Sequence, residues 1–328
     1  MTIPINRRTA LGHALAGSLW VGLAGTGRHA QAEATVKLIL PNATGSGVDA
    51  ITRSAASALG KALNASVVIE NMAGAGGVLG LQALTKAAPD GNTLSVVSNN
   101  VVIFPSVIKS LPFNMPADFT PIAMVGSTPM VLVVNPQKVS ATTAKEWMAQ
   151  LKAKPDGYNF GSGGTGTILH LAAEMFLDEA KVSARHIPYK GVGQMVTDLL
   201  GGQIDFAVVA TPSVLQHIKA GTLRAIGMCG DKRTPALPDV PTFVEQGLPG
   251  YVMEAWFAVI GPKGMTPASV KKVNEALVAA FNDAGVKEAM AKQGNLIQIS
   301  SSEQAEKAFR SELIKYAALV KKAGITPE

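Results

Sequence analysis

The chain has 328 residues, of which 47% are hydrophobic and 16% are charged, and its formal net charge is +6. This length permits two domains with separate cores, and the high apolar share excludes an intrinsically disordered chain. The lysines and arginines are scattered and no aromatic residues are interleaved with them, so we do not expect nucleic acid as a partner.

The first 32 residues predict a secretory signal peptide that is cleaved after Ala32. Arg7 and Arg8 form a basic start, residues 10–26 are apolar or small, and residues 30–32 read Ala-Gln-Ala. The arginine pair partly resembles a twin-arginine signal, so the export route stays open. An uncleaved membrane anchor is the alternative, but the apolar stretch is short and rich in glycine. We therefore expect a periplasmic protein. Without the three arginines of this segment, which holds no acid, the mature chain has a net charge of +3.

Strand-like and helix-like segments alternate through the first part of the mature chain. The expected strands are residues 36–40, 67–69 and 94–97, and the expected helices are residues 49–63 and 78–87. A glycine-rich turn at residues 74–77 and a Pro-Asp-Gly turn at residues 89–91 separate these segments. This strand-helix order predicts a parallel sheet with helices on both faces.

A second set of alternating segments follows and is long enough to form its own lobe. The expected strands are residues 129–134, 158–160, 186–188, 206–209 and 223–228, and the expected helices are residues 144–152, 169–179, 194–200 and 214–220. Two more helices, 269–281 and 302–322, are charged on one face, and we expect them to pack back on the first lobe. The fold class is therefore α/β with two lobes.

Two loops rich in Gly, Ser and Thr follow strands and lead into helices, at residues 41–47 and 161–167. Ligands of open α/β sheets bind at such loops, where glycine allows close approach and helix amides attract anions. The candidate uncharged donors are the hydroxyls of Thr44, Ser46, Ser162, Thr165 and Thr167. For one such loop alone, a helix cap or a tight turn would be the better interpretation. Because each lobe carries one, we favour a carboxylate site.

A dinucleotide-binding motif is the sharpest alternative for the first loop. Gly45-x-Gly47-x-x-Ala50 opens a helix, and Glu70 ends the next expected strand. However, four residues separate the strand end at Leu40 from the first glycine, whereas the motif needs that glycine at the strand end. Export also removes the chain from the main nicotinamide pools. We therefore favour a carboxylate-binding protein over a dehydrogenase.

Signatures of catalysis or metal binding are otherwise poor. Phe160 occupies the first glycine position of the G-x-S-x-G pattern around Ser162. His170 and Glu174 are four residues apart, which suits a helix-stabilising pair better than a zinc site that lacks a second histidine. The lone Cys229 fits a small buried residue. We expect no enzyme activity, no cofactor and no bound metal.

Short motifs in a fixed order identify a family. They are residues 70–77 (ENMAGAGG), 88–94 (APDGNTL), 118–122 (DFTPI), 161–167 (GSGGTGT) with His170-Leu171, 188–191 (PYKG), 200–205 (LGGQID) and 237–242 (LPDVPT). With these motifs the chain resembles the Bug family of extracytoplasmic solute receptors, which are the binding components of tripartite tricarboxylate transporters. The match covers nearly all of the mature chain.

The resemblance implies a type II periplasmic binding protein fold: two doubly wound α/β lobes joined by two crossovers, with a ligand cleft between them. Lobe 1 would comprise residues 33–128 and 229–328, and lobe 2 residues 129–228. In the family, the two glycine-rich loops grip a carboxylate, largely through backbone amides, hydroxyls and ordered water. The matching positions are Asn42, Thr44, Gly45, Ser46, Gly47, Asp49, Ser98, Asn99, Ser162, Gly163, Gly164, Thr165, Gly166, Thr167, Ala210 and Thr211.

One departure from the family concerns the first loop. The family usually has an aromatic residue after the proline, then proline and consecutive glycines, whereas this chain has Asn42, Thr44 and Ser46. The distal pocket should therefore be more polar. We expect a monomer that clamps a small di- or tricarboxylate, amino acid or aromatic acid by hinged closure. Its membrane partner would be a permease of the tripartite tricarboxylate type or a membrane sensor.

Overall fold

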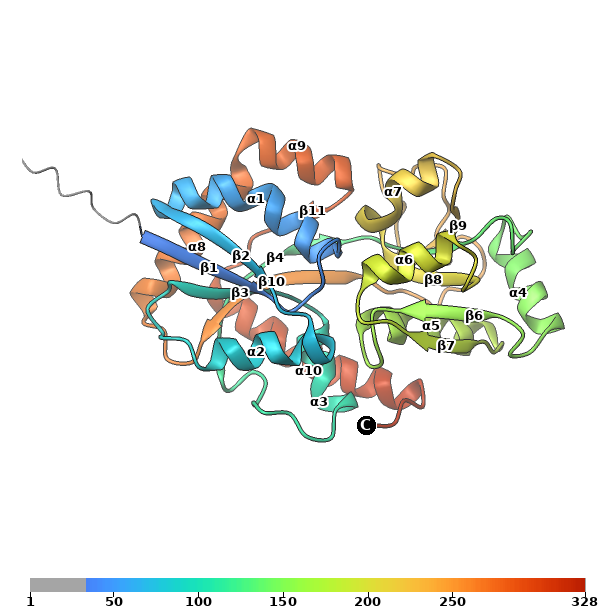
Figure 1. Ribbon diagram of the computed structural model, residues 1–328, viewed down its shortest axis with the longest axis horizontal. Coiled ribbons are helices and arrows are strands. Elements are labelled where there is room, and N and C mark those ends of the chain that lie inside the picture. The colour runs from blue at the N-terminus through green and yellow to red at the C-terminus, as the bar shows by residue number, and fades with distance from the viewer. Residues whose placement is uncertain (1–33, 328) are drawn as a thin grey trace, which may run out of the picture. The chain divides into compact units, whose positions relative to one another are not determined.

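The computed structural model describes residues 34–327, in which strands and helices alternate along the chain (Figure 1). The expected signal peptide and its cleavage site lie outside the described residues. The described residues form a six-stranded and a five-stranded sheet, each covered by helices. Within the described range, no helix has both the length and the apolar content needed to cross a membrane.

The larger sheet has the strand order β11-β4-β10-β3-β1-β2. Its strands are β1 (Ala34–Leu40), β2 (Ala65–Asn71), β3 (Thr93–Ser98), β4 (Phe119–Thr128), β10 (Ala255–Pro262) and β11 (Leu296–Ile297). β1 runs parallel to β2 and β3, whereas β10 runs antiparallel to β3 and β4. The expected parallel arrangement is therefore confirmed for the first three strands. It is wrong for the whole sheet, because β10 enters from the later part of the chain in the opposite direction.

Seven helical segments accompany this sheet. They are α1 (Gly47–Leu63), the 3₁₀ turn η1 (Gly74–Gly77), α2 (Val78–Thr85), α3 (Asn100–Val107), α8 (Pro267–Asn282), α9 (Ala284–Gln293) and α10 (Ser302–Lys322). α1 buries Ile51, Ala55 and Leu59 at four-residue spacing, the pattern of one apolar helix face. α8 packs against α1, and α10 packs against β4 and α3. The expectation that the C-terminal helices pack on the first lobe is thus confirmed.

The smaller sheet has the strand order β7-β6-β8-β5-β9. Its strands are β5 (Met130–Val134), β6 (Asn159–Ser162), β7 (Arg185–Pro188), β8 (Phe206–Ala210) and β9 (Arg224–Met228), and its helices are α4 (Ala144–Ala153), α5 (Ile168–Ala180), α6 (Val192–Leu200) and α7 (Thr211–Lys219). β6 runs parallel to β7 and β8, and β5 runs antiparallel to β8 and β9. Every residue of β5 is buried, which explains its uninterrupted apolar sequence.

The chain crosses between the sheets twice, from β4 to β5 and from β9 back to β10. One apolar cluster extends across the junction and includes Phe104 from the first half and Phe160 from the second. A second cluster lies between the larger sheet and helices α1 and α8, and contains Leu38, Ile51 and Phe257. The two sheets are thus held on a shared core, and their strand ends meet at the site described next.

Candidate functional site

A cavity of about 80 Å³ lies at the strand ends of the two sheets. Segments that follow β1, β3, β6, β7 and β8 line it, together with the start of β10. A single buried water needs about 10–15 Å³ of such volume, so the cavity can hold several waters or a small solute. The position agrees with the rule that open α/β sheets bind ligands beyond the carboxyl ends of their strands.

Five helices begin at this cavity, two from the larger-sheet half and three from the smaller-sheet half. The residues that line the cavity at these starts are Ser46, Gly47 and Val48 of α1, Asn100 of α3, Thr167, Ile168 and Leu169 of α5, Gly191 and Val192 of α6, and Ala210 of α7. The first turn of a helix presents unbonded N–H groups and the positive end of the helix dipole. Their convergence makes the cavity favourable for an anion.

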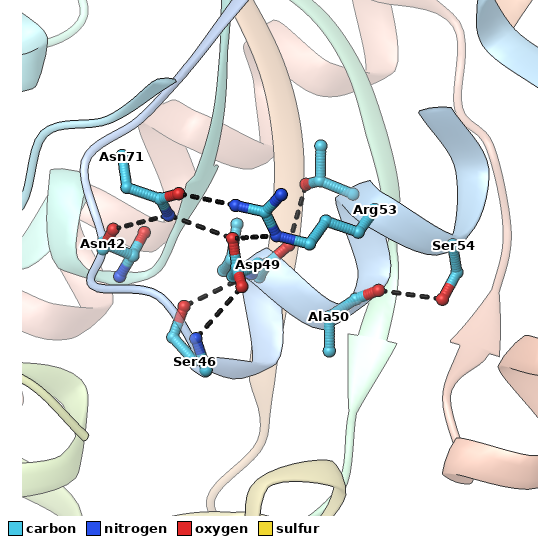
Figure 2. Close-up of polar contacts among 10 residues, drawn as sticks. Asn42, Ser46, Asp49, Ala50, Arg53, Ser54 and Asn71 are labelled. Carbon is cyan, nitrogen blue, oxygen red and sulfur yellow. Dashed lines mark hydrogen bonds and ion pairs between the residues drawn. The ribbon is translucent and has the colours of Figure 1, made fainter. Parts of the chain in front are cut away.

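The first loop is shaped by the carboxylate of Asp49 (Figure 2). Asp49 accepts hydrogen bonds from the Gly45 backbone N–H (3.0 Å), Arg53 Nε (2.9 Å) and Asn71 Nδ2 (3.0 Å). Asn71 Nδ2 also donates to the Asn42 carbonyl (3.1 Å). Burial alone would raise the pKa of Asp49, but these hydrogen bonds together outweigh burial and lower it. Asp49 therefore stays ionised and holds the loop from behind, outside the cavity lining.

A close glycine contact supports the same loop. Gly77, at the end of η1, has φ +114, and a Cβ there would collide with the carbonyl oxygen of Pro41. Only glycine allows both this backbone conformation and this approach. Ser46 caps α1 by accepting the N–H of Asp49 (3.2 Å), so the loop ends directly at the helix start.

The second loop is closed by its own hydroxyls. Ser162 Oγ donates to the Gly164 carbonyl (3.0 Å) and accepts the Gly164 N–H (3.1 Å), while Thr167 Oγ1 donates to the same carbonyl (2.8 Å). Thr167 also caps α5. Both hydroxyls are thus engaged within the loop, and they shape it so that Gly163 and the start of α5 face the cavity.

Two stacked histidines brace this loop. The rings of His170 and His186 lie 3.9 Å apart and nearly parallel. His170 Nδ1 accepts the Gly166 N–H (3.1 Å), and His186 Nε2 lies 2.6 Å from Ser162 Oγ. Burial, followed by the nearby His170, lowers the pKa of His186 to about 4, so this ring stays neutral near pH 7. His170 also contacts Glu174 at 3.4 Å, the helix pair expected from their spacing.

The two halves touch around the cavity, so the structure shows a closed arrangement. Asn100 Oδ1 of α3 accepts the N–H of Ile168 at the start of α5 (2.8 Å). Ser213 Oγ of α7 donates to the Gly45 carbonyl in the first loop (3.3 Å). Gly191, before α6, packs against Ala43 so closely that a Cβ there would lie 2.5 Å from the Ala43 Cβ.

The structure brings seven of the expected site residues to the cavity wall. They are Asn42, Ser46, Gly47, Ser98, Gly163, Thr167 and Ala210. The other nine lie outside the lining: Thr44, Gly45, Asp49, Asn99, Ser162, Gly164, Thr165, Gly166 and Thr211. Four of these have side chains with clear structural roles, and one of the four, Ser162, closes the second loop as described above. Asn99 binds the Trp256 N–H (2.7 Å) and the Tyr316 hydroxyl (2.5 Å), and Thr211 Oγ1 donates to the Pro129 carbonyl (2.9 Å). Asp49 orders the first loop, as described above.

Several lining residues were not among the expected positions. Asn100, Thr128, Lys190, Ser213 and Trp256 all line the cavity. Lys190 stands within the PYKG motif, which could have pointed to it. Thr128 and Asn100 carry no local signal, because only the packing of the two halves places them here.

Two residues of this wall carry a side-chain oxygen that is left without a partner in the described part of the chain. Asn42 Oδ1 and Thr128 Oγ1 are buried, and among the residues 34–327 neither has a hydrogen-bond partner. Buried polar atoms are normally satisfied, because leaving one unpaired costs about 1–3 kcal/mol.

The features that suggested other chemistry have structural roles. Glu70, the candidate ribose-binding acid, pairs with Lys37 at 2.8 Å and does not line the cavity. Cys229 is free and fully buried as expected, and burial raises the pKa of its thiol to about 12. In the described part of the chain, no three His, Cys, Asp or Glu side chains gather where they could hold a metal ion.

Known proteins share this arrangement over nearly the whole described chain. The family model of the tripartite tricarboxylate transporter family receptor matches residues 51–325. Protein BugT of Bordetella pertussis is 36% identical over 291 residues, which covers 88% of this chain and 89% of that protein.

Solved structures agree with the sequence match. The periplasmic binding protein BugD superposes with a TM-score of 0.85 at 30% identity, covering 90% of this chain and 99% of that one. An R. palustris protein with adipate gives 0.86 at 25% identity, covering 90% and 98%. MatC from Rhodopseudomonas palustris with bound malate gives 0.79 at 28% identity, covering 87% and 98%. The fold is therefore the two-lobed α/β fold of the periplasmic binding proteins, and the chain belongs to the tripartite tricarboxylate transporter receptor family, to which the Bug proteins also belong.

Proposed function

We propose that this protein is a periplasmic receptor that captures a small carboxylate between two lobes and presents it to the membrane permease of a tripartite tricarboxylate transporter. It performs no chemistry on the ligand. One lobe would comprise residues 33–128 and 229–328, and the other would comprise residues 129–228. The first set of residues contains all strands of the larger sheet, and the second set contains all strands of the smaller sheet.

One observation carries the proposal: five helix N-termini from both halves converge on a cavity that, among residues 34–327, no acidic side chain lines. Backbone amides at helix starts stabilise an anion without bringing a full opposite charge. Among the described residues, Lys190 is the one charged residue in the lining, and its side chain is largely exposed. Release to a permease then does not require breaking a deeply buried ion pair.

The relatives support the class of ligand. One solved relative was studied with adipate and another with bound malate, both small dicarboxylates. A carboxylate that bridges both halves favours the closed arrangement by its higher affinity for it. The seven expected residues at the cavity wall, with Asn100 and Ser213 joining the halves, are the proposed binding and closure residues.

Thermal unfolding of the purified protein with a panel of small acids tests the function. The panel comprises di- and tricarboxylates, amino acids and aromatic acids, with matched uncharged amides as controls. A bound acid should raise the melting temperature with a logarithmic dependence on concentration, and titration calorimetry should give one site per chain. If no acid shifts the transition beyond its amide control, the carboxylate proposal fails.

The predicted export and signal-peptide cleavage can be tested separately from ligand binding. Mass spectrometry of the protein from the periplasmic fraction should find a chain that begins at Glu33, directly after the Ala-Gln-Ala sequence. Recovery of the chain in the cytoplasm with residues 1–32 intact would contradict both the signal peptide and the periplasmic location.

A further inference from the structure

Two of the expected site residues that lie outside the cavity lining, Asn99 and Thr211, are fully buried where the chain crosses between the sheets. The first crossover is a single residue, Pro129, between the end of β4 at Thr128 and the start of β5. The second crossover enters β10 at Ala255, which pairs directly with Thr128. Paired strands lie about 4.8 Å apart, so both crossovers leave the larger sheet at neighbouring points.

Asn99 fastens the second crossover to the larger-sheet half. Its side-chain Oδ1 accepts the Trp256 N–H (2.7 Å), and its Nδ2 donates to the Glu254 carbonyl (3.3 Å), so the amide bonds the chain on both sides of Ala255. Nδ2 also donates to the Tyr316 hydroxyl of α10 (2.5 Å). Because Asn99 directly follows β3, one buried amide ties the start of β10 both to β3 and to the C-terminal helix.

Other hydrogen bonds hold each crossover to the smaller-sheet half. The Pro129 carbonyl accepts both the N–H and the Oγ1 hydroxyl of Thr211 at the start of α7, each at 2.9 Å. In the second crossover, the Met253 N–H donates to the Cys229 carbonyl (2.8 Å), and the Cys229 N–H donates to the Met130 carbonyl in β5 (2.9 Å). On this side the two crossovers are therefore bonded at Pro129 and at Met253.

The stretches of main chain left between these bonds are short. They are the link at residues 128–129 in the first crossover and the link at residues 253–254 in the second. We infer that Asn99 and Thr211 are positioning residues for ligand capture, which confine the bending of the crossovers to these two links and do not touch the ligand. This inference rests on the proposed capture between two lobes and specifies which side chains guide their closure.

The segment that links β9 to β10, residues 229–253, then moves with the smaller sheet. It contributes no strand to either sheet, and it is bonded to the smaller-sheet half at a second place, where the Tyr251 hydroxyl donates to the Ala172 carbonyl of α5 (2.9 Å). The lobe boundary on this crossover therefore shifts from residue 228 to residue 253. Both hinge links then lie next to the Thr128–Ala255 pair, which gives the closing motion a single axis.

The confinement of the hinge favours tight binding. A crossover that is loose in the open form must become ordered when the lobes close. Ordering the backbone of one additional residue weakens binding about 5- to 30-fold. Crossovers that are already bonded on both sides have few torsions left to order, so their side-chain bonds act on affinity from outside the cavity.

Titration calorimetry of the purified chain with the panel of small acids, starting with succinate, malate and citrate, tests the Thr211 anchor. Thr211→Val removes the hydroxyl that holds Pro129 and keeps the N–H bond, so the tightest-binding acid should lose about fivefold in affinity. Thr211→Ser keeps the hydroxyl and should bind like the parent. The matched control is Thr120→Val, because Thr120 Oγ1 also donates to a proline carbonyl, that of Pro262 (2.8 Å), near the start of β4 and far from the hinge. The control should lose a similar amount of melting temperature and no affinity.

Tyr316→Phe tests the other anchor and keeps the ring in the core. It removes the hydroxyl that holds the Asn99 amide, so the same acid should bind about threefold more weakly. A merely structural role for this hydroxyl would lower the melting temperature of the ligand-free protein and leave the affinity of the folded protein unchanged.

A distance measurement without ligand tests the hinge itself. Spin labels at Lys61→Cys in α1 and Lys219→Cys in α7 occupy exposed positions in opposite halves, and the native Cys229 is buried, so it stays unlabelled. The distribution of label-to-label distances should be wider in the two anchor variants than in the parent. The Thr120→Val control should give the distribution of the parent.

The outcomes separate this inference from the proposed function. If acids bind but both anchor variants match the control in affinity, the inference is wrong and the receptor function stands. Unchanged distance distributions in the anchor variants would also overturn it. If no acid binds the parent, the carboxylate function fails, and the distance distributions alone decide whether Asn99 and Thr211 confine the hinge.

Discussion

The closed contact between the halves can be tested with a single methyl group. Gly191 has φ 175 and ψ 164, an extended conformation that alanine adopts without strain, so Gly191→Ala should fold normally. The new Cβ would lie 2.5 Å from the Ala43 Cβ, whereas carbon atoms pack at about 3.5–4.0 Å. The segment that contains Gly191 and the first loop at Ala43 must therefore separate by roughly 1 Å, about the difference between those distances.

That separation acts on the bonds that close the cavity. The Ser213–Gly45 hydrogen bond is already 3.3 Å long, so a shift of this size breaks it, and ligand contacts that bridge the halves lengthen as well. Losing one or two such bonds costs about 1–3 kcal/mol, which corresponds to binding about 5- to 150-fold weaker. The melting temperature of the ligand-free protein should change little.

Titration calorimetry with the tightest-binding acid of the panel measures the loss of affinity in Gly191→Ala. Gly193→Ala is the matched control. A Cβ at Gly193 would meet Thr44 at 3.7 Å, an ordinary contact, and alanine suits its helical position in α6. The control should bind like the parent protein. Parent-like affinity for Gly191→Ala would refute closure by this contact, and so would an equal loss in both variants.

Two other predictions concern the loops. Asp49→Asn removes the charge that accepts from Arg53 and Gly45, so it should loosen the first loop and weaken acid binding by about tenfold in calorimetry; unchanged affinity would show that the loop holds its shape without this charge. The second prediction concerns pH. Because burial and His170 hold the pKa of His186 near 4, below its ordinary 6.5, the unfolded chain takes up this proton first, and stability should fall as the pH drops from 6.5 toward 4. Between pH 7.5 and pH 5, the urea concentration at the unfolding midpoint should therefore fall more for the parent protein than for His186→Gln. Equal falls in the two proteins would contradict the assignment of this pH dependence to His186.

The elements that could be predicted from sequence have clear periodicity or turns at their ends. α10 was expected at residues 302–322 and occupies that range, because its apolar residues repeat at helical spacing and Ser301 forms a capping box with Gln304. The alternating segments of the smaller sheet were also found, each within a few residues. Local pattern is sufficient where an element has one buried face.

Two of the missed elements, α3 and β4, lack such a face. α3 is buried on nearly all sides and contains Pro105, so its sequence shows no helical period. β4 contains Pro121 and Gly126 and carries irregularities in its pairing with β10, so it does not alternate. Their character is set by the elements packed on both sides, which a local window does not contain.

The candidate site divides in the same way. The two glycine-rich loops could be found from their composition and place in the strand-helix order. Sequence could not tell which of their side chains face the cavity, because Ser162 and Asp49 turn away to hold their own loops. Asn100 and Thr128 reach the wall only because the two halves come together there.

The bond between Asn100 and the Ile168 N–H has a consequence for the resting receptor. The side chain supplies the acceptor that an incoming anion would otherwise provide, so part of the population can shut while empty. Only open molecules can bind the ligand. The apparent dissociation constant therefore rises in inverse proportion to the fraction of ligand-free molecules that are open. The Asn100 side chain thereby influences the apparent affinity of the ligand-free receptor separately from the contacts that hold the bound ligand.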